Sequence, residues 1–172
     1  MKKDFNRLLK EIDADDMREE LRVLYDRFPV VREYYKMELG ESTKAVVDKY
    51  KADLRKAFFS SKRRVSRRGR SESKKVLKAF SLVSIHPRDL VELYFYRAEV
   101  MAEAVVHYRI ENDSFLLATV KAFEEALVLA EKELLIESYH PQIEQLSQYF
   151  GDHVRYGDYS FWPLFREYFG EG

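Results

Sequence analysis

Apolar residues recur three and four positions apart along almost the whole chain, which is the spacing of one face of an α-helix. Short polar stretches rich in helix-capping residues separate these patterns. No stretch alternates apolar and polar residues convincingly enough to predict a β-strand. We therefore predict about nine helices, near residues 5–12, 17–28, 29–39, 42–60, 72–83, 87–111, 115–135, 141–150 and 161–169.

Several helix ends have recognisable capping residues. Asp13 or Asp15 is placed to cap the second helix, and Pro29 stands at the start of the third, where a missing N–H costs nothing. The third helix is expected to stop at Gly40, a residue able to take the left-handed conformation of a helix C-cap. The stretch "ENDS" at 111–114 separates the two longest helices with three capping-type residues.

The two longest helices are apolar over a wide arc, so we expect them to be the most buried. Their inward positions are predicted to include Leu93, Met101, Val120 and Leu127. A chain of 172 residues fits a single domain, which we place at residues 1–172. The predicted fold is all-α, either a single-domain multi-helix bundle or a short α-solenoid-like array of helical hairpins, and both arrangements remain open.

Four segments resemble successive parts of a bacterial family known only as a domain of unknown function. They are "LYDRFPVVREYY", "KYKADLRKAFF", "HPRDLVELYFYRAE" and "FEEALVLAEKELL". The resemblance covers most of the chain. It implies a small, soluble, helical bacterial protein, and it supplies no catalytic residue, substrate or partner.

Composition narrows the class of protein further. Hydrophobic residues make up 46% and charged residues 35%, with only six Gly and four Pro, which suits a compact helical protein. No segment has the roughly 18–20 uncharged apolar residues that a membrane span requires, so we expect no membrane partner. The absence of Cys rules out disulfides, thiol catalysis and Cys-based zinc sites, and it fits a cytoplasmic location.

Catalytic and metal-binding patterns are weak. The chain has no Gly-x-Ser-x-Gly elbow, phosphate-binding glycine loop or His-Glu-x-x-His helix, so we assign no catalytic residue and no cofactor. Glu99, Glu103 and His107 share one helix face, and carboxylates on the next helix could face them. Di-iron bundles, however, use Glu and His three positions apart on two helices, so a charged helix edge is the better interpretation and no metal ligand is assigned. His153, in a glycine-flanked loop, is the histidine best placed for a cleft.

Charge is distributed unevenly although the chain is neutral. Residues 62–100 hold 11 basic and 4 acidic side chains, whereas residues 101–172 hold 5 and 13. The stretch "SSKRRVSRRGRSESKK" at 60–75 could bind a polyanion, pair with an acidic surface of its own or another copy, or stay solvated. We predict a mobile, exposed basic connector at 60–72. The polyanion alternative would use Lys62, Arg63, Arg64, Arg67, Arg68 and Arg70.

Aromatic residues supply one more candidate surface. Tyr96 faces away from the apolar stripe of its helix, so it could contact a partner or a second layer of helices. The sequence predicts a helical protein-interaction or scaffold module, with weak polyanion binding through residues 62–75 as the alternative and an enzyme less favoured. The expected partner is a protein, nucleic acid is possible but not favoured, and self-association through the charge asymmetry is possible.

Overall fold

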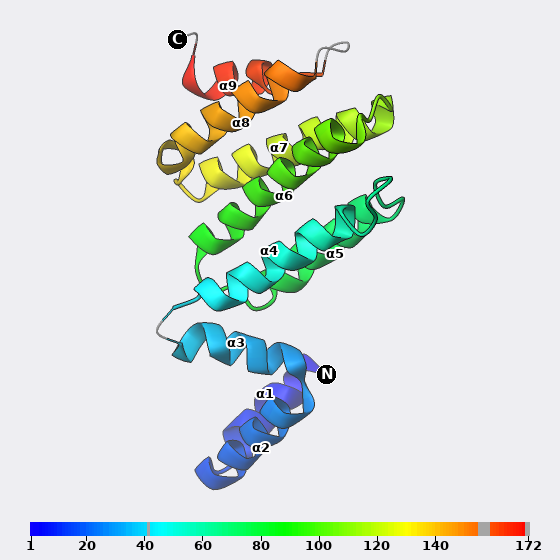
Figure 1. Cartoon of the computed structure of the whole chain (residues 1–172). Helices are drawn as coiled ribbons and strands as arrows, with labels where there is room; N and C mark the ends of the chain where they lie inside the picture. Colours follow the sequence, from blue (N-terminus) through cyan, green and yellow to red (C-terminus); the bar gives the residue numbers. More distant parts are fainter. Residues whose placement is uncertain (41, 155–158, 171–172) are drawn as a thin grey trace.

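The computed structural model describes residues 1–40, 42–154 and 159–170, and within them the chain folds into α-helices without a β-strand (Figure 1). The all-α prediction is therefore confirmed. The helices are α1 (Lys2–Glu11), α2 (Ala14–Arg27), α3 (Pro29–Leu39), α4 (Lys44–Phe58), α5 (Gly69–Ser81), α6 (Pro87–Tyr108), α7 (Asp113–Lys132), α8 (His140–His153) and α9 (Trp162–Phe169). A short 3₁₀ helix, η1 (Ile136–Tyr139), precedes α8.

Successive helices pair into hairpins that stack on one another. The hairpins α4/α5, α6/α7 and α8/α9 follow one another up the molecule, and α1, α2 and α3 lie at the opposite end (Figure 1). Helix α6 is central, since it contacts α4, α5, α7 and α8. Of the two arrangements that the sequence left open, the stacked hairpins are the one observed, within one domain.

The core forms two clusters that meet along α6. The larger cluster joins α6 to α7, α8 and α9, and the smaller one joins α3, α4, α5 and the start of α6. Leu93, Met101 and Leu127 are fully buried, as predicted. Val120 is only half-buried, because the inward stripe of α7 passes through Thr119, whose hydroxyl donates to the Phe115 carbonyl oxygen at 2.9 Å and so tolerates the core.

Three phenylalanine rings close the C-terminal end of the larger cluster. The Phe161 ring stacks between Phe123 of α7 and Phe150 of α8, with both pairs of ring centroids 4.2 Å apart. Phe161 is the residue just before α9, so this stack holds α9 against the preceding hairpin. His140 at the start of α8 packs on Phe165 and adds a second contact with α9.

Helix capping agrees with the sequence at the second helix and differs at the third. The Asp13 carboxylate accepts hydrogen bonds from the backbone N–H of Asp15 and Asp16, both at 2.9 Å. Helix α3 ends at Gly40 as predicted, but Gly40 has φ −77° and is extended, so it does not use the left-handed conformation that glycine allows. Glycine is needed there for space, because a Cβ atom would lie 2.5 Å from the carbonyl oxygen of Lys36.

The segment between α4 and α5 is shorter than the sequence suggested. Helix α5 begins at Gly69, not near residue 72, so the connector covers residues 59–68, which we call the basic loop. Gly69 is buried, and a Cβ atom there would lie 2.8 Å from both the Ala57 carbonyl oxygen and the Phe58 ring. The start of α5 thus packs closely on the end of α4, which a larger residue would prevent.

Candidate binding groove

Helices α4, α6 and α8 border two adjoining cavities on the same side of the stack. The cavities have volumes of about 610 Å³ and about 320 Å³, and both are lined by Glu99 of α6 and Gln142 of α8. We call them together the groove. Its lining consists of Lys51, Arg55, Phe59, Arg88, Glu92, Tyr96, Glu99, Glu103, Val106, His107, Ser138, Tyr139, Gln142, Gln145, Leu146 and Tyr149.

A polar stripe of α6 forms the floor of the groove. Glu92, Tyr96, Glu99 and Glu103 follow one another at intervals of three and four residues, so they lie on the same face of the helix. The apolar residues between them, such as Met101, point into the core. The same helical period that buries one side of α6 therefore presents carboxylates to the groove on another.

Two ion pairs join the wall formed by α4 to this floor. The Arg55 Nη1 atom lies 2.6 Å from a carboxylate oxygen of Glu103, and Lys51 pairs with Glu92. The Lys51 ammonium also lies 5.3 Å from the centroid of the Tyr96 ring. These side chains are partly exposed, so the pairs add little stability but hold the walls of the groove at a defined spacing.

Glu99 lies between those two ion pairs without a partner of its own. In the described part of the chain, its carboxylate makes no hydrogen bond or salt bridge, although it is half-buried at the junction of the two cavities. Burial, together with the nearby Glu103 carboxylate, raises the pKa of Glu99, and the charges of Lys51 and Arg55 only partly oppose this. The groove thus contains an acceptor that is not used within the fold.

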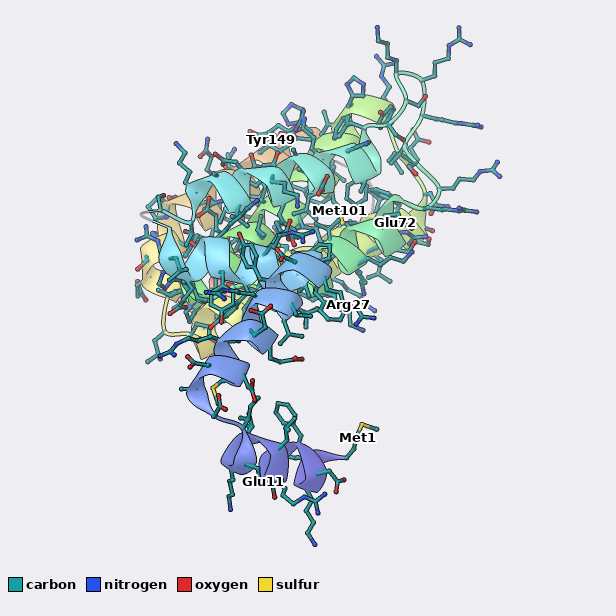
Figure 2. The ribbon with its side chains drawn as sticks, turned by 90° about the horizontal axis from the view of Figure 1, so that it is seen from below. Met1, Glu11, Arg27, Glu72, Met101 and Tyr149 are labelled. Atoms are coloured by element: carbon teal, nitrogen blue, oxygen red, sulfur yellow. The ribbon has the colours of Figure 1, made fainter. Side chains whose placement is uncertain are left out.

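Aromatic rings border the larger cavity. The ring centroids of Phe59 and His107 lie 5.6 Å apart. The Arg55 Cζ atom lies 4.7 Å from the centroid of the Phe59 ring. Tyr149 of α8 also lines this cavity, and Figure 2 labels it on the side of the molecule along which α4 runs. Burial and the nearby Glu103 and Glu99 carboxylates raise the pKa of its phenol.

The candidate metal ligands do not come together. Glu99, Glu103 and His107 line the groove, whereas Glu125 of α7 faces α5 and pairs with Arg97 at 2.7 Å and Lys74 at 3.6 Å. Among the described residues, no three His, Asp or Glu side chains are grouped so that they could hold a metal ion.

Tyr96 and His153 differ in their surroundings. Tyr96 is half-buried, packs against both core clusters and lines the smaller cavity beside Lys51 of α4. His153 is exposed at the end of α8, where its Nδ1 atom lies 2.8 Å from the Tyr149 carbonyl oxygen. It does not line the groove, and its predicted loop neighbours Arg155 and Tyr156 lie outside the described residues.

The six basic candidates divide into two groups. Figure 2 shows long basic side chains spreading into solvent from the segment that precedes Glu72. Within the described residues, five basic-loop side chains are exposed and form no ion pair or hydrogen bond: Lys62, Arg63, Arg64, Arg67 and Arg68. Arg70 instead belongs to α5, and its Nη1 donates to the carbonyl oxygen of Ser114 at 2.8 Å.

The backbone of the basic loop is attached to the body at several points. The Tyr108 hydroxyl donates to the Ser61 carbonyl oxygen, and the Ser66 N–H donates to the Phe58 carbonyl oxygen at 3.4 Å. Val65 is half-buried against the larger core cluster. The charged side chains of the basic loop therefore extend from a backbone that is attached to the rest of the molecule at Ser61, Val65 and Ser66.

Sequence reasoning did not find most of the groove. Lys51 and Arg55 pair with residues 41 and 48 positions later in the chain, and Gln142, Gln145 and Tyr149 come from a third helix. One signal was available, since cations four residues apart on α4 match the acidic stripe on α6. Their pairing depends on how the hairpins stack, which the sequence does not specify.

Comparison with known proteins identifies the family. A family model described as a family of unknown function (DUF6155) matches residues 1–155, and the chain belongs to that family. The family resemblance seen in the sequence is therefore confirmed. Searches of curated proteins and of solved structures returned no match. Within the described residues, no helix has both the length and the apolar character needed to cross a bilayer.

Proposed function

We propose that the protein is an interaction module that binds a peptide segment of a partner protein in the groove. The observation that carries this proposal is the Glu99 carboxylate at the junction of the two cavities, which makes no hydrogen bond or salt bridge to any residue the structure describes. Stacked helical hairpins commonly bind partners on an extended surface formed by successive repeats. Here the groove crosses the first helix of each of three successive hairpins.

The chemistry of the groove favours a peptide with a basic side chain. Neighbouring cations are already paired, Arg55 with Glu103 and Lys51 with Glu92, whereas Glu99 is available. A lysine or arginine of the peptide would neutralise the half-buried carboxylate and could lie over the ring of Tyr149. The amides of Gln142 and Gln145 would supply hydrogen bonds to an extended peptide backbone.

A displayed library of random 12-residue peptides tests this proposal. We expect selection against the wild-type protein to enrich peptides that contain Lys or Arg, and Glu99→Gln to weaken binding of a synthesised enriched peptide about tenfold by fluorescence anisotropy. Gln145→Trp, which fills the larger cavity, should abolish binding, whereas Gln148→Trp on an exposed face of α8 should not. No enrichment, or enriched peptides that bind the Gln145→Trp protein equally well, would refute the groove as the site.

Polyanion binding by the basic loop is a second candidate function. It is supported by the five exposed cations that form no ion pair in the described part of the chain. Closely spaced cations bind phosphates or sulfates by releasing counterions, so binding should weaken steeply as salt increases. Replacing Arg63, Arg64, Arg67 and Arg68 by Gln should shift elution from heparin to lower salt. Unchanged elution would rule out this loop as a polyanion site.

The cellular setting remains part of the proposal. The absence of Cys supports a cytoplasmic location, because proteins of that compartment rarely contain disulfides. A bacterial source is supported only by the segments that resemble the bacterial family.

A further inference from the structure

Helices α1 and α2 expose their apolar faces to solvent. Neither helix has a buried residue, and Phe5, Leu8 and Leu9 are 58%, 51% and 46% exposed. Met17 and Leu21 continue the exposed apolar surface on α2. Figure 2 shows α1, with Met1 and Glu11 labelled, projecting away from the rest of the molecule.

Such helices need a partner surface. Isolated helices shorter than about 12–15 residues are marginally stable in water, and most helical stability in proteins comes from packing an amphipathic face. Helix α1 has 10 residues and α2 has 14. Exposed apolar faces on two consecutive helices are typical of an interaction site.

The charges around this surface change sign along the chain, from basic over most of α1 to acidic at the end of α1 and the start of α2. Residues 2–10 contain four basic and one acidic side chain, whereas residues 11–20 contain six acidic and one basic. The ion pairs observed here stay local, as in Arg7–Glu11 and Arg18–Asp15. In the described residues, no salt bridge joins α1 to α2. Arg7, Glu11 and Glu19 are paired within their own helices, whereas the side chains of Lys3, Lys10, Asp16 and Glu20 form no ion pair there and can meet charges of a partner.

A cavity between these helices has the matching character. It has a volume of about 480 Å³ and combines apolar Leu8 and Ile12 with acidic Glu11, Asp16, Glu19 and Glu20. An apolar floor with an acidic rim fits an amphipathic helix whose polar edge is basic. Helix α1 is itself such a helix, because Lys3, Arg7 and Lys10 accompany its apolar residues.

We propose that two copies of the chain associate through this surface, with the basic α1 of each copy lying against the acidic start of α2 in the other. A two-fold axis makes the two α1–α2 contacts equivalent. Basic side chains of α1 therefore meet acidic side chains of α2 at both contacts of the interface. The apolar faces of both helix pairs are covered in the same arrangement. This surface is separate from the groove, so the proposal does not depend on peptide binding.

Charge reversal tests the pairing directly. Sedimentation velocity of the full chain at about 50 µM should show a dimer. Reversing α1 (Lys3→Glu, Arg7→Glu, Lys10→Glu) or the start of α2 (Asp16→Lys, Glu19→Lys, Glu20→Lys) should raise the dissociation constant at least about tenfold. An equimolar mixture of the two variants should form a heterodimer, because each contact then joins opposite charges again.

A matched control for the α1 variant changes the net charge by the same amount in another part of the chain. Reversing Lys62, Arg64 and Arg67 of the basic loop to Glu should leave the dimer intact, since this loop follows the C-terminal end of α4 and lies away from α1 and α2 (Figure 1). A wild-type chain that is monomeric at this concentration would overturn the proposal. So would dimers that persist in both reversed variants, or two monomeric variants that do not associate when mixed.

Discussion

At the residue scale, two long helices end at left-handed residues that are not glycine. Arg109 has φ 50° and Leu134 has φ 58°. After each, the next N–H bonds back to the helix, from Ile110 to the Val105 carbonyl oxygen at 2.9 Å and from Leu135 to the Ala130 carbonyl oxygen at 2.8 Å. Ile110 and Leu135 then pack on the core, which offsets the unfavourable backbone conformation.

Leu134→Gly should therefore stabilise the protein. The side chain is 91% exposed and contributes no packing, while a left-handed non-glycine residue costs roughly 1–2 kcal/mol. We expect the free energy of unfolding in urea to rise by about 1 kcal/mol. Leu82→Gly is the matched control, since Leu82 is also exposed but right-handed, and glycine there should lower stability. Equal effects of both substitutions would contradict this account of the helix end.

Glu99 should reduce stability at neutral pH because its ionised carboxylate is half-buried beside Glu103. Its pKa is raised in the folded state by burial and by Glu103, so the ionised form is less favourable there than in the unfolded chain. This cost appears as pH rises above the ordinary value of 4.5 and is complete above the folded-state pKa. Glu99→Gln should thus raise the midpoint of urea unfolding at pH 7, and the gain should vanish well below pH 4.5.

Glu103→Gln supplies the comparison for that measurement. This substitution removes the partner of Arg55 and is not expected to increase stability at pH 7. A gain for Glu99→Gln that stayed constant down to acid pH would show that ionisation is not its cause.

At the element scale, one buried arginine connects three helices. Arg97 of α6 is 2% exposed, and its Nε donates to the Ser73 hydroxyl of α5 at 3.1 Å. Its Nη1 donates to the Glu125 carboxylate of α7 at 2.7 Å. The hydrogen bonds of Arg97 fix the relative positions of the three helices. They add little net stability, because burying a guanidinium carries a large desolvation cost.

The two partners should respond unequally to substitution. Glu125→Gln leaves the buried guanidinium without its carboxylate, with Lys74 nearby, and should cost about 3 kcal/mol of unfolding free energy. Arg97→Met removes the buried charge and leaves Glu125 partly exposed beside Lys74, so it should cost only about 1 kcal/mol or less. Urea unfolding of both variants measures the difference, and the reverse order would contradict this interpretation.

Much of the secondary structure was predictable from the sequence. Helical periodicity located the helices, and Asp13 and Pro29 marked two helix starts correctly. The start of α5 was missed, because its first turn contains Gly69 and Arg70, which resemble a loop until the packing against α4 is known. The groove was missed because it depends on contacts between residues of three hairpins.

At the scale of the whole molecule, burial changes along the stack. Helices α6 and α7 contribute the most buried side chains, whereas α1 and α2 contribute none. Local opening needs little free energy where few apolar contacts are lost. Stability is therefore expected to be lowest at the N-terminal end and highest in the middle hairpin.

Hydrogen exchange read by mass spectrometry checks this gradient. Amides of residues 2–27 should exchange fastest in a dilute sample, and those of residues 90–130 slowest. If the chain dimerises as proposed, protection of residues 2–27 should increase with protein concentration, because association would cover their apolar faces. Strong protection of α1 in a dilute, monomeric sample would contradict the gradient.

The position of the Phe161 ring bears on whether further copies could add to the proposed dimer. A stack of hairpins could in principle be extended by another copy at either end, and head-to-tail addition would produce open filaments. Near the C-terminal end, the space between Phe123 and Phe150 is filled by Phe161 of the same chain, so this space is closed to another copy. In the proposed dimer the two N-terminal ends form a closed pair, so we expect the assembly to stop at two chains and not to polymerise.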